Sequence, residues 1–114
     1  YYIENFWWRI QNYLEDIDAI VVYGSVATGN ARDDSDIDIL ILVKRNTKRY
    51  KRKFNALMVG PKGKQEMIMA QVFKTGDFMN SLKKGSKFAE GVIKNHKVIY
   101  DLDKKFEKIK NELK

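Results

Sequence analysis

The sequence predicts a single α+β domain in which a small mixed sheet of about four strands is flanked by helices. The chain has 114 residues, a length that suits one compact domain. Short runs of β-branched and aromatic residues alternate with segments whose apolar residues recur at helical spacing. No internal repeat or long linker divides the chain, so we expect residues 1–114 to form one domain.

The first half of the chain predicts two strands and two helices. Strands are indicated by runs of β-branched and aliphatic residues, and helices by apolar residues three or four positions apart. The strand patterns lie at residues 19–23 and 36–43, and the helix patterns at residues 2–16 and 47–58. Asn46-Thr47 is a favourable N-cap for the second helix, and Gly60-Pro61 predicts a turn after it.

The second half predicts two further strands and three helices. Strands are expected at residues 66–73 and 98–100, with His96 in a turn between elements. Each helix is preceded by a residue type that favours the N-cap position. These expected caps are Thr75, Ser86 and Asp103.

The composition is that of an ordinary folded protein, with 44% hydrophobic and 32% charged residues. Cysteine is absent, which excludes disulfides and thiolate metal sites. The longest apolar run, residues 37–43, is interrupted by Asp38 and is too short to span a membrane. With no recognisable signal peptide, these features favour a cytoplasmic location without a membrane partner. The net charge of +7 suits a polyanionic partner, although a lysine-rich soluble surface explains it equally well.

Gly24 and Ser25 lie where the first predicted strand ends. Glycine allows a sharp turn and close approach of the backbone to a ligand. Backbone amides in such a turn, together with the Ser25 hydroxyl, can hold phosphate groups. A Gly-Ser turn alone is weak evidence, because many turns have this composition.

Asp36 and Asp38 are two residues apart in the second predicted strand. The period of a strand puts both carboxylates on one face and Ile37 and Ile39 on the other. Adjacent carboxylates repel each other unless a cation lies between them, and Mg²⁺ shared with phosphates fits oxygen ligands of this kind. A lone Asp-x-Asp is more often a solvated strand end. The pair indicates a metal site only in combination with the preceding Gly-Ser.

Together, Gly24-Ser25 and Asp36-Ile37-Asp38 resemble the signature of the nucleotidyltransferase superfamily that includes DNA polymerase beta. The closest resemblance is to its minimal, stand-alone bacterial and archaeal members. It implies the polymerase-beta-like fold and transfer of a nucleoside monophosphate, with AMP favoured, from ATP or another nucleoside triphosphate to a hydroxyl group. By this resemblance Gly24 and Ser25 hold the phosphates, while Asp36 and Asp38 bind Mg²⁺, with Mn²⁺ as an alternative.

The resemblance also implies a third carboxylate on the next strand, which shares a metal ion and helps to deprotonate the acceptor. Glu66 is the only carboxylate in the predicted strand 66–73, so it is the candidate for a catalytic and metal-binding residue. Its match requires a shift of one residue, and the alternative is a surface residue at a strand start. Family members often carry arginines after the Gly-Ser, where this chain has Val26 and Thr28.

These departures leave two hypotheses. The first is an active transferase whose acceptor lies on another molecule; by resemblance, that partner is a small helical protein of the HEPN type found with minimal nucleotidyltransferases in toxin–antitoxin pairs. The second is a catalytically degenerate module that binds nucleotide or a partner. Residues 44–53, with seven basic side chains in ten, add a weaker nucleic-acid alternative. A helix that buries Tyr50 and Phe54 and solvates these cations is the favoured interpretation.

Overall fold

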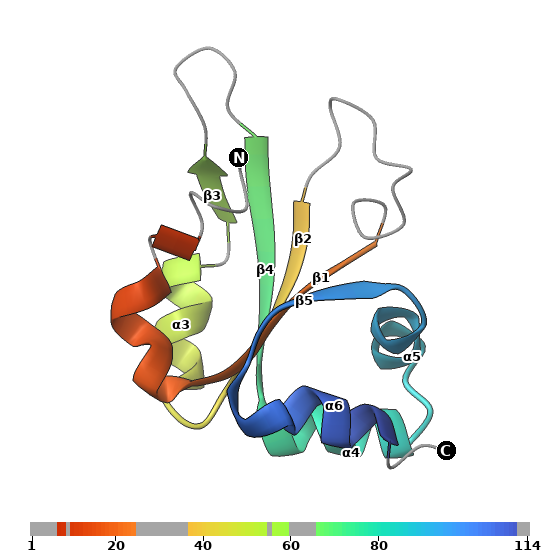
Figure 1. The fold of residues 1–114 in the computed structure, drawn as a ribbon. Helices are drawn as coiled ribbons and strands as arrows, with labels where there is room; N and C mark the ends of the chain where they lie inside the picture. Colours follow the sequence, from red (N-terminus) through yellow and green to blue (C-terminus); the bar gives the residue numbers. More distant parts are fainter. Residues whose placement is uncertain (1–6, 9, 25–36, 55, 60–65, 112–114) are drawn as a thin grey trace.

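The computed structural model describes residues 7–8, 10–24, 37–54, 56–59 and 66–111. The described part of the chain contains both strands and helices, as the sequence predicts (Figure 1). In order, they are η1 (Gln11–Asp16), β1 (Ile17–Tyr23), β2 (Ile37–Val43), α3 (Thr47–Phe54), β3 (Ala56–Val59), β4 (Glu66–Lys74), α4 (Thr75–Lys83), α5 (Lys87–Lys94), β5 (His96–Asp101), η2 (Leu102–Lys104) and α6 (Lys105–Asn111).

The strands form one mixed sheet in the order β3-β4-β2-β1-β5. β2 and β4 run parallel, whereas the other neighbouring pairs are antiparallel. The predicted α+β class, a mixed sheet flanked by helices, is therefore confirmed. β1 and β2 lie inside the sheet, and every residue of each is buried except Tyr23 and Asp38, which are half-buried at the ends of their strands.

The sheet contains one strand more than the sequence analysis expected. The helix predicted for residues 47–58 ends at Phe54, and Ala56–Val59 pairs with β4 as strand β3. Apolar residues at positions 57 and 58 fit a helical repeat and a short strand equally well. Pairing with the edge of β4 decides between the two, and no sequence pattern reports that pairing.

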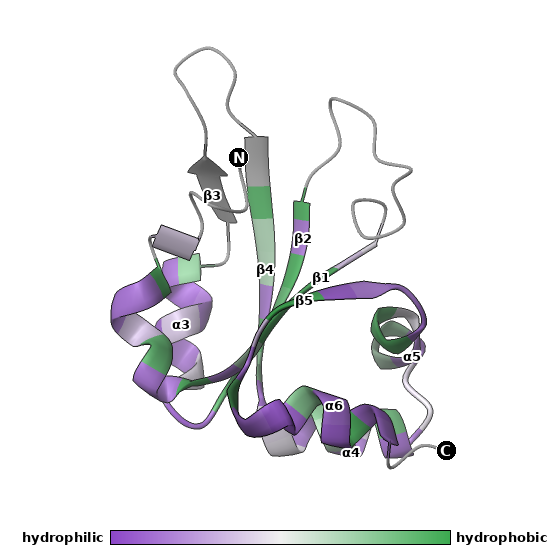
Figure 2. Ribbon diagram, in the orientation of Figure 1, coloured by the Kyte–Doolittle hydropathy of each residue, from purple (hydrophilic) through white to green (hydrophobic). Residues whose placement is uncertain are grey.

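Helices cover both faces of the sheet. On one face, Ile39 and Ile41 of β2 pack with Tyr50 and Phe54 of α3. On the other, Leu40 and Leu42 pack with residues of α4, α5 and α6. Figure 1 shows α3 and these three helices on opposite sides of the strands, and Figure 2 shows the apolar residues concentrated in β1 and β2 between them. The alternation of β2 therefore assigns each of its apolar side chains to one of two cores.

Two of the three predicted helix caps are wrong. Ser86 does cap α5, since its hydroxyl accepts a hydrogen bond from the Ala89 amide. Thr75 instead begins α4 and donates its hydroxyl to Asp18, 2.5 Å away. For α6, the carboxylate of Asp101 accepts the Phe106 amide at 2.7 Å, whereas Asp103 lies in η2 with φ of 53°.

The aromatic residues near the chain ends differ in exposure. His96 begins β5 and packs edge-on against Phe106, so its predicted place in a turn is wrong. Of the two neighbouring tryptophans, Trp7 packs on Tyr100 while Trp8 is 72% exposed. Within the described ranges, no helix combines the length and the apolar character that crossing a membrane requires.

Candidate functional site

Gly24 and Asp38 lie side by side at the end of the central antiparallel pair of strands. Tyr23, the last residue of β1, is in register with Asp38 of β2, and Gly24 follows directly. Gly24 has a φ of +76°, a conformation that glycine adopts without strain. A Cβ atom at this position would lie 3.0 Å from Asp38 Oδ2. The carboxylate thus occupies space that only a glycine leaves open.

The face on which Asp38 lies agrees with the strand-period prediction. Ile37 and Ile39 are buried in the core beneath α3, whereas Leu40 belongs to the opposite core. Asp38 has the parity of Leu40, so it lies on the face covered by α4, α5 and α6. Its neighbours in the predicted site, Ser25 and Asp36, lie outside the described residues, and their roles stay predictions.

A tyrosine bounds this carboxylate on one side. Burial, and to a lesser degree the negative charge of Asp38, raises the pKa of Tyr23 to about 12. The phenol therefore stays protonated and neutral at physiological pH, and it can only be a hydrogen-bonding or packing group there. Its ring meets Phe88 of α5 edge-on, with centroids 5.4 Å apart. Tyr23 thus connects the Asp38 end of the central strands to α5.

Glu66 is the first residue of β4, and its backbone pairs with Val59 of β3. Its side chain lies outside what the structure describes, so its role as third carboxylate stays a prediction. The residue of β4 in register with Asp38 is Met69, three positions further along. Ile68 and Ala70, on either side of Met69, are buried in the opposite core. Met69 is therefore the β4 residue beside Asp38 on the same face, and a thioether is a poor ligand for Mg²⁺.

A second Asp-x-Asp sequence, Asp16-Ile17-Asp18, lies at the far end of β1, and its acids have structural partners. Asp16 accepts hydrogen bonds from Tyr50 Oη at 2.5 Å and Arg45 Nε at 2.6 Å, which hold the pKa of its carboxyl below the ordinary value. Asp18 pairs with Lys105 Nζ at 2.8 Å and accepts the Thr75 hydroxyl. These contacts tie helices and loops to β1.

The geometry of Gly24 and Asp38 fits a magnesium–phosphate group. A half-buried carboxylate offers the hard oxygen ligand that Mg²⁺ prefers, and the turn at Gly24 directly beside it has no side chain that would keep a phosphate from the backbone. Among the described residues, no three side chains of His, Cys, Asp or Glu come together as a metal site. A site at Asp38 therefore needs ligands from the bound nucleotide or from residues outside the described ranges, as the prediction for Asp36 already requires.

Comparison with known proteins gives two further findings. Residues 9–105 match the family described as "Polymerase beta, Nucleotidyltransferase". The chain is also 26% identical, over 102 residues, to a protein of Methanocaldococcus jannaschii that bears the name "Putative protein adenylyltransferase MJ1305". This alignment covers 82% of the chain and 65% of the relative, so the chain spans just under two thirds of that protein.

Proposed function

The chain belongs to the polymerase beta nucleotidyltransferase family, and on this premise we propose that it binds a magnesium-complexed nucleoside triphosphate beside Asp38. The observation that carries the proposal is the contact between the Asp38 carboxylate and the glycine backbone at residue 24. It brings a carboxylate that suits Mg²⁺ and a glycine turn that suits a phosphate together at one end of the sheet. We favour ATP as the nucleotide, in keeping with the name of the archaeal relative.

The proposed reaction transfers a nucleoside monophosphate to a hydroxyl group. The acceptor oxygen forms a bond to the α-phosphorus, the bond from that phosphorus to the β-bridging oxygen breaks, and pyrophosphate leaves with the electron pair. The hydroxyl proton passes to a carboxylate, for which Glu66 is the candidate, or to water. Bound Mg²⁺ supplies positive charge that neutralises the phosphates. Asp36 and Asp38 would hold it, while Gly24 and Ser25 position the phosphates.

Isothermal titration with Mg·ATP tests the binding step. The variant Asp36→Asn/Asp38→Asn removes both proposed ligands, and we expect its binding to fall below detection. Asp77→Asn/Asp103→Asn makes the same charge change at exposed residues away from the site and should bind as the wild type does. Unchanged affinity in the first variant would contradict the metal-site proposal.

Transfer is tested separately with labelled ATP and candidate acceptors, including a helical HEPN-type partner protein. We expect labelling that requires Asp36 and Asp38. Glu66→Gln should lower the rate about a hundredfold or more while leaving Mg·ATP affinity nearly unchanged, because a general base contributes to the chemical step. An unaffected rate would remove Glu66 from the catalytic set.

The register of β4 favours a second candidate function, a nucleotide-binding module without transferase activity. Met69 is in register with Asp38, where a further carboxylate would complete a three-acid site. Val26 and Thr28 in place of arginines point in the same direction. Mg·ATP binding that depends on Asp38, combined with no transfer to any acceptor or to water, would establish this alternative.

A further inference from the structure

The surface of α3 carries a concentration of positive charge that the nucleotide site does not use. Residues 44–53 include seven basic side chains, and α3 contains no acidic residue. Some of the cations have partners: Arg45 pairs with Asp16, and Arg49 and Lys53 lie over the ring of Tyr13. The exposed side chains of Lys48, Lys51 and Arg52 form no ion pair with a carboxylate in the described part of the chain.

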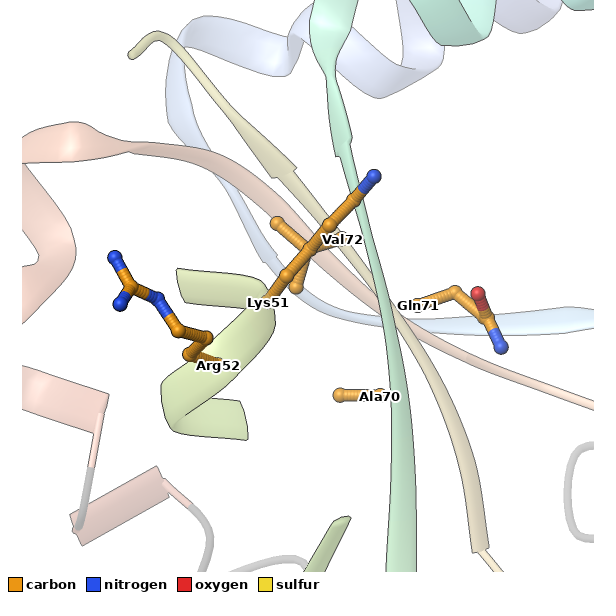
Figure 3. Close-up of a pocket in the computed structure, with 5 residues that line it drawn as sticks. All are labelled: Lys51, Arg52, Ala70, Gln71 and Val72. Atoms are coloured by element: carbon orange, nitrogen blue, oxygen red, sulfur yellow. The ribbon is translucent and has the colours of Figure 1, made fainter. Parts of the chain in front are cut away.

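A hollow of about 500 Å³ lies between α3 and β4 beside two of these cations (Figure 3). Its lining residues are Lys51, Arg52, Ala70, Gln71 and Val72. The side chains that face it are cationic on α3 and apolar on β4, whereas the Gln71 side chain points to the other side of the strand. Figure 3 shows Ala70 and Val72 on the α3 side of β4, with Lys51 extending along the strand above them. The hollow thus has an apolar floor and a cationic rim.

This region is separated from the nucleotide site. α3 packs on the face of the sheet opposite to the one that carries Asp38. Along the sheet the two regions are close, because Ala70 and Val72 of the hollow are in register with Ile39 and Ile41. The sheet itself lies between them. A ligand on α3 and a nucleotide beside Asp38 can therefore bind together, and the triphosphate tail is a poor candidate for the α3 cations.

The composition of the surface favours a peptide over a nucleic acid. Single-stranded nucleic acids are commonly held by exposed aromatic rings on which bases stack. Here Tyr50 is only 1% exposed, and the ring of Tyr13 is covered by Arg49 and Lys53. An apolar floor with a cationic rim instead complements a chain segment that carries carboxylates among aliphatic side chains.

We propose that the α3 surface, defined as Lys48, Lys51, Arg52 and the adjoining hollow, docks an acidic segment of the protein that accepts the nucleotide. The docking surface stands on the charges and the hollow; only the identity of the partner as acceptor rests on the proposed function. The surface holds the partner on the face of the sheet opposite to Asp38, so it determines which protein is bound and leaves the reacting groups to the other face.

The probe is a fluorescein-labelled peptide of about twelve residues in which Glu alternates with Val and Thr. The peptide is titrated with the full chain at low salt, and binding is measured as the increase in fluorescence anisotropy. We expect saturable binding that weakens about tenfold or more in Lys48→Glu/Lys51→Glu/Arg52→Glu, because several weak charge contacts are reversed together. Lys83→Glu/Lys84→Glu/Lys87→Glu is the matched control, since it changes the net charge equally at exposed lysines near α4 and α5. It should bind the peptide within about threefold of wild type.

Four results would overturn the inference: no saturable peptide binding, an equal loss in both triple variants, an unchanged affinity in the α3 variant, or tighter α3-dependent binding of a thymidine dodecamer than of the peptide. Circular dichroism and urea unfolding verify that each variant folds. Lys51→Gln/Arg52→Gln is a milder second variant, for which we expect a loss of about threefold.

The same proteins separate this inference from the proposed function. Mg·ATP titration should give wild-type affinity for the α3 triple variant, and peptide binding should persist in Asp36→Asn/Asp38→Asn. Loss of peptide selectivity with intact nucleotide transfer overturns the docking surface alone. Selective peptide binding by a chain that never binds Mg·ATP overturns the proposed function and leaves the docking surface standing.

Discussion

The carboxylate of Asp38 lies against the backbone of Gly24, with Oδ2 3.0 Å from the point where a Cβ atom of residue 24 would stand. Gly24 also has a φ of +76°, which costs a residue with a side chain roughly 1–2 kcal/mol. A larger residue at this position would therefore have two effects. The positive φ would lower the stability of the fold, and the added side chain would displace the Asp38 carboxylate.

We predict that Gly24→Ala weakens Mg·ATP binding by about tenfold, because the added methyl group displaces the Asp38 carboxylate. It should also lower the free energy of unfolding by about 1–2 kcal/mol. Titration calorimetry and urea unfolding measure the two effects.

Gly85→Ala is the matched control. Gly85 has a φ of +80°, but a Cβ atom there would meet nothing closer than Glu90 Oε1 at 3.9 Å. This variant should show a similar loss of stability and wild-type nucleotide affinity. Equal nucleotide affinities in the two variants would mean that the Gly24 contact does not position Asp38.

The register between β2 and β4 leads to a second prediction. Met69→Asp places a carboxylate opposite Asp38 on the same face, and it should raise the affinity for Mn²⁺ or Mg²⁺ by about tenfold. Titration with Mn²⁺, followed by its paramagnetic resonance signal, measures this without requiring activity. Gln71→Asp adds the same charge opposite Leu40, further from the site, and should change the affinity little. An identical gain in both would indicate general electrostatic attraction.

A third prediction concerns pH. Hydrogen bonds from Tyr50 and Arg45 hold the pKa of Asp16 below its ordinary value of 3.8. The ionised carboxylate therefore stabilises the fold above that value, and this contribution is lost as the pH falls through the lowered pKa of the folded state. Asp16→Asn should be less stable than wild type at pH 7, and the difference should shrink in acid. Urea unfolding at neutral and acidic pH measures both; a difference that is constant across the range would contradict the assignment.

The cap of α6 gives a fourth prediction. Asp101 accepts hydrogen bonds from the amides of Phe106 and Glu107, so Asp101→Ala should lower the free energy of unfolding by about 1 kcal/mol. Asp103→Ala, the position indicated by the sequence alone, removes no such bond and should have a smaller effect. Thermal and urea unfolding compare the two, and the reverse order of stabilities would restore Asp103 as the cap.

The sequence was sufficient to predict most of the sheet. β1, β2, β4 and β5 are short runs of β-branched and apolar residues, a pattern that predicts strands. β3 was not predicted, because apolar residues at Leu57 and Met58 fit a helix as well as a strand. The hydrogen bond from Thr75 to Asp18 is also not predictable from a local pattern, because the two residues are 57 positions apart in the chain. Both errors concern contacts between separate segments, which the pattern of one segment does not report.

In the candidate site, too, features that depend on one segment are predictable from the sequence, whereas features that depend on pairing between segments are not. The period of β2 correctly placed Asp38 on the face opposite Ile37 and Ile39, because alternation is a property of one strand. The proximity of Gly24 followed from the order of the two motifs. That Met69 lies beside Asp38 depends on the register of a parallel neighbour, which neither strand encodes by itself.

The ends of the connection between β1 and β2 are held by strand pairing. Tyr23 and Asp38 are opposite each other in one ladder, and Gly24 begins the chain that links them. The spacing between the glycine turn and the acid is thus set by backbone hydrogen bonds and does not depend on the residues in between. Insertions or substitutions between residues 26 and 35 would therefore leave the distance between Gly24 and Asp38 unchanged.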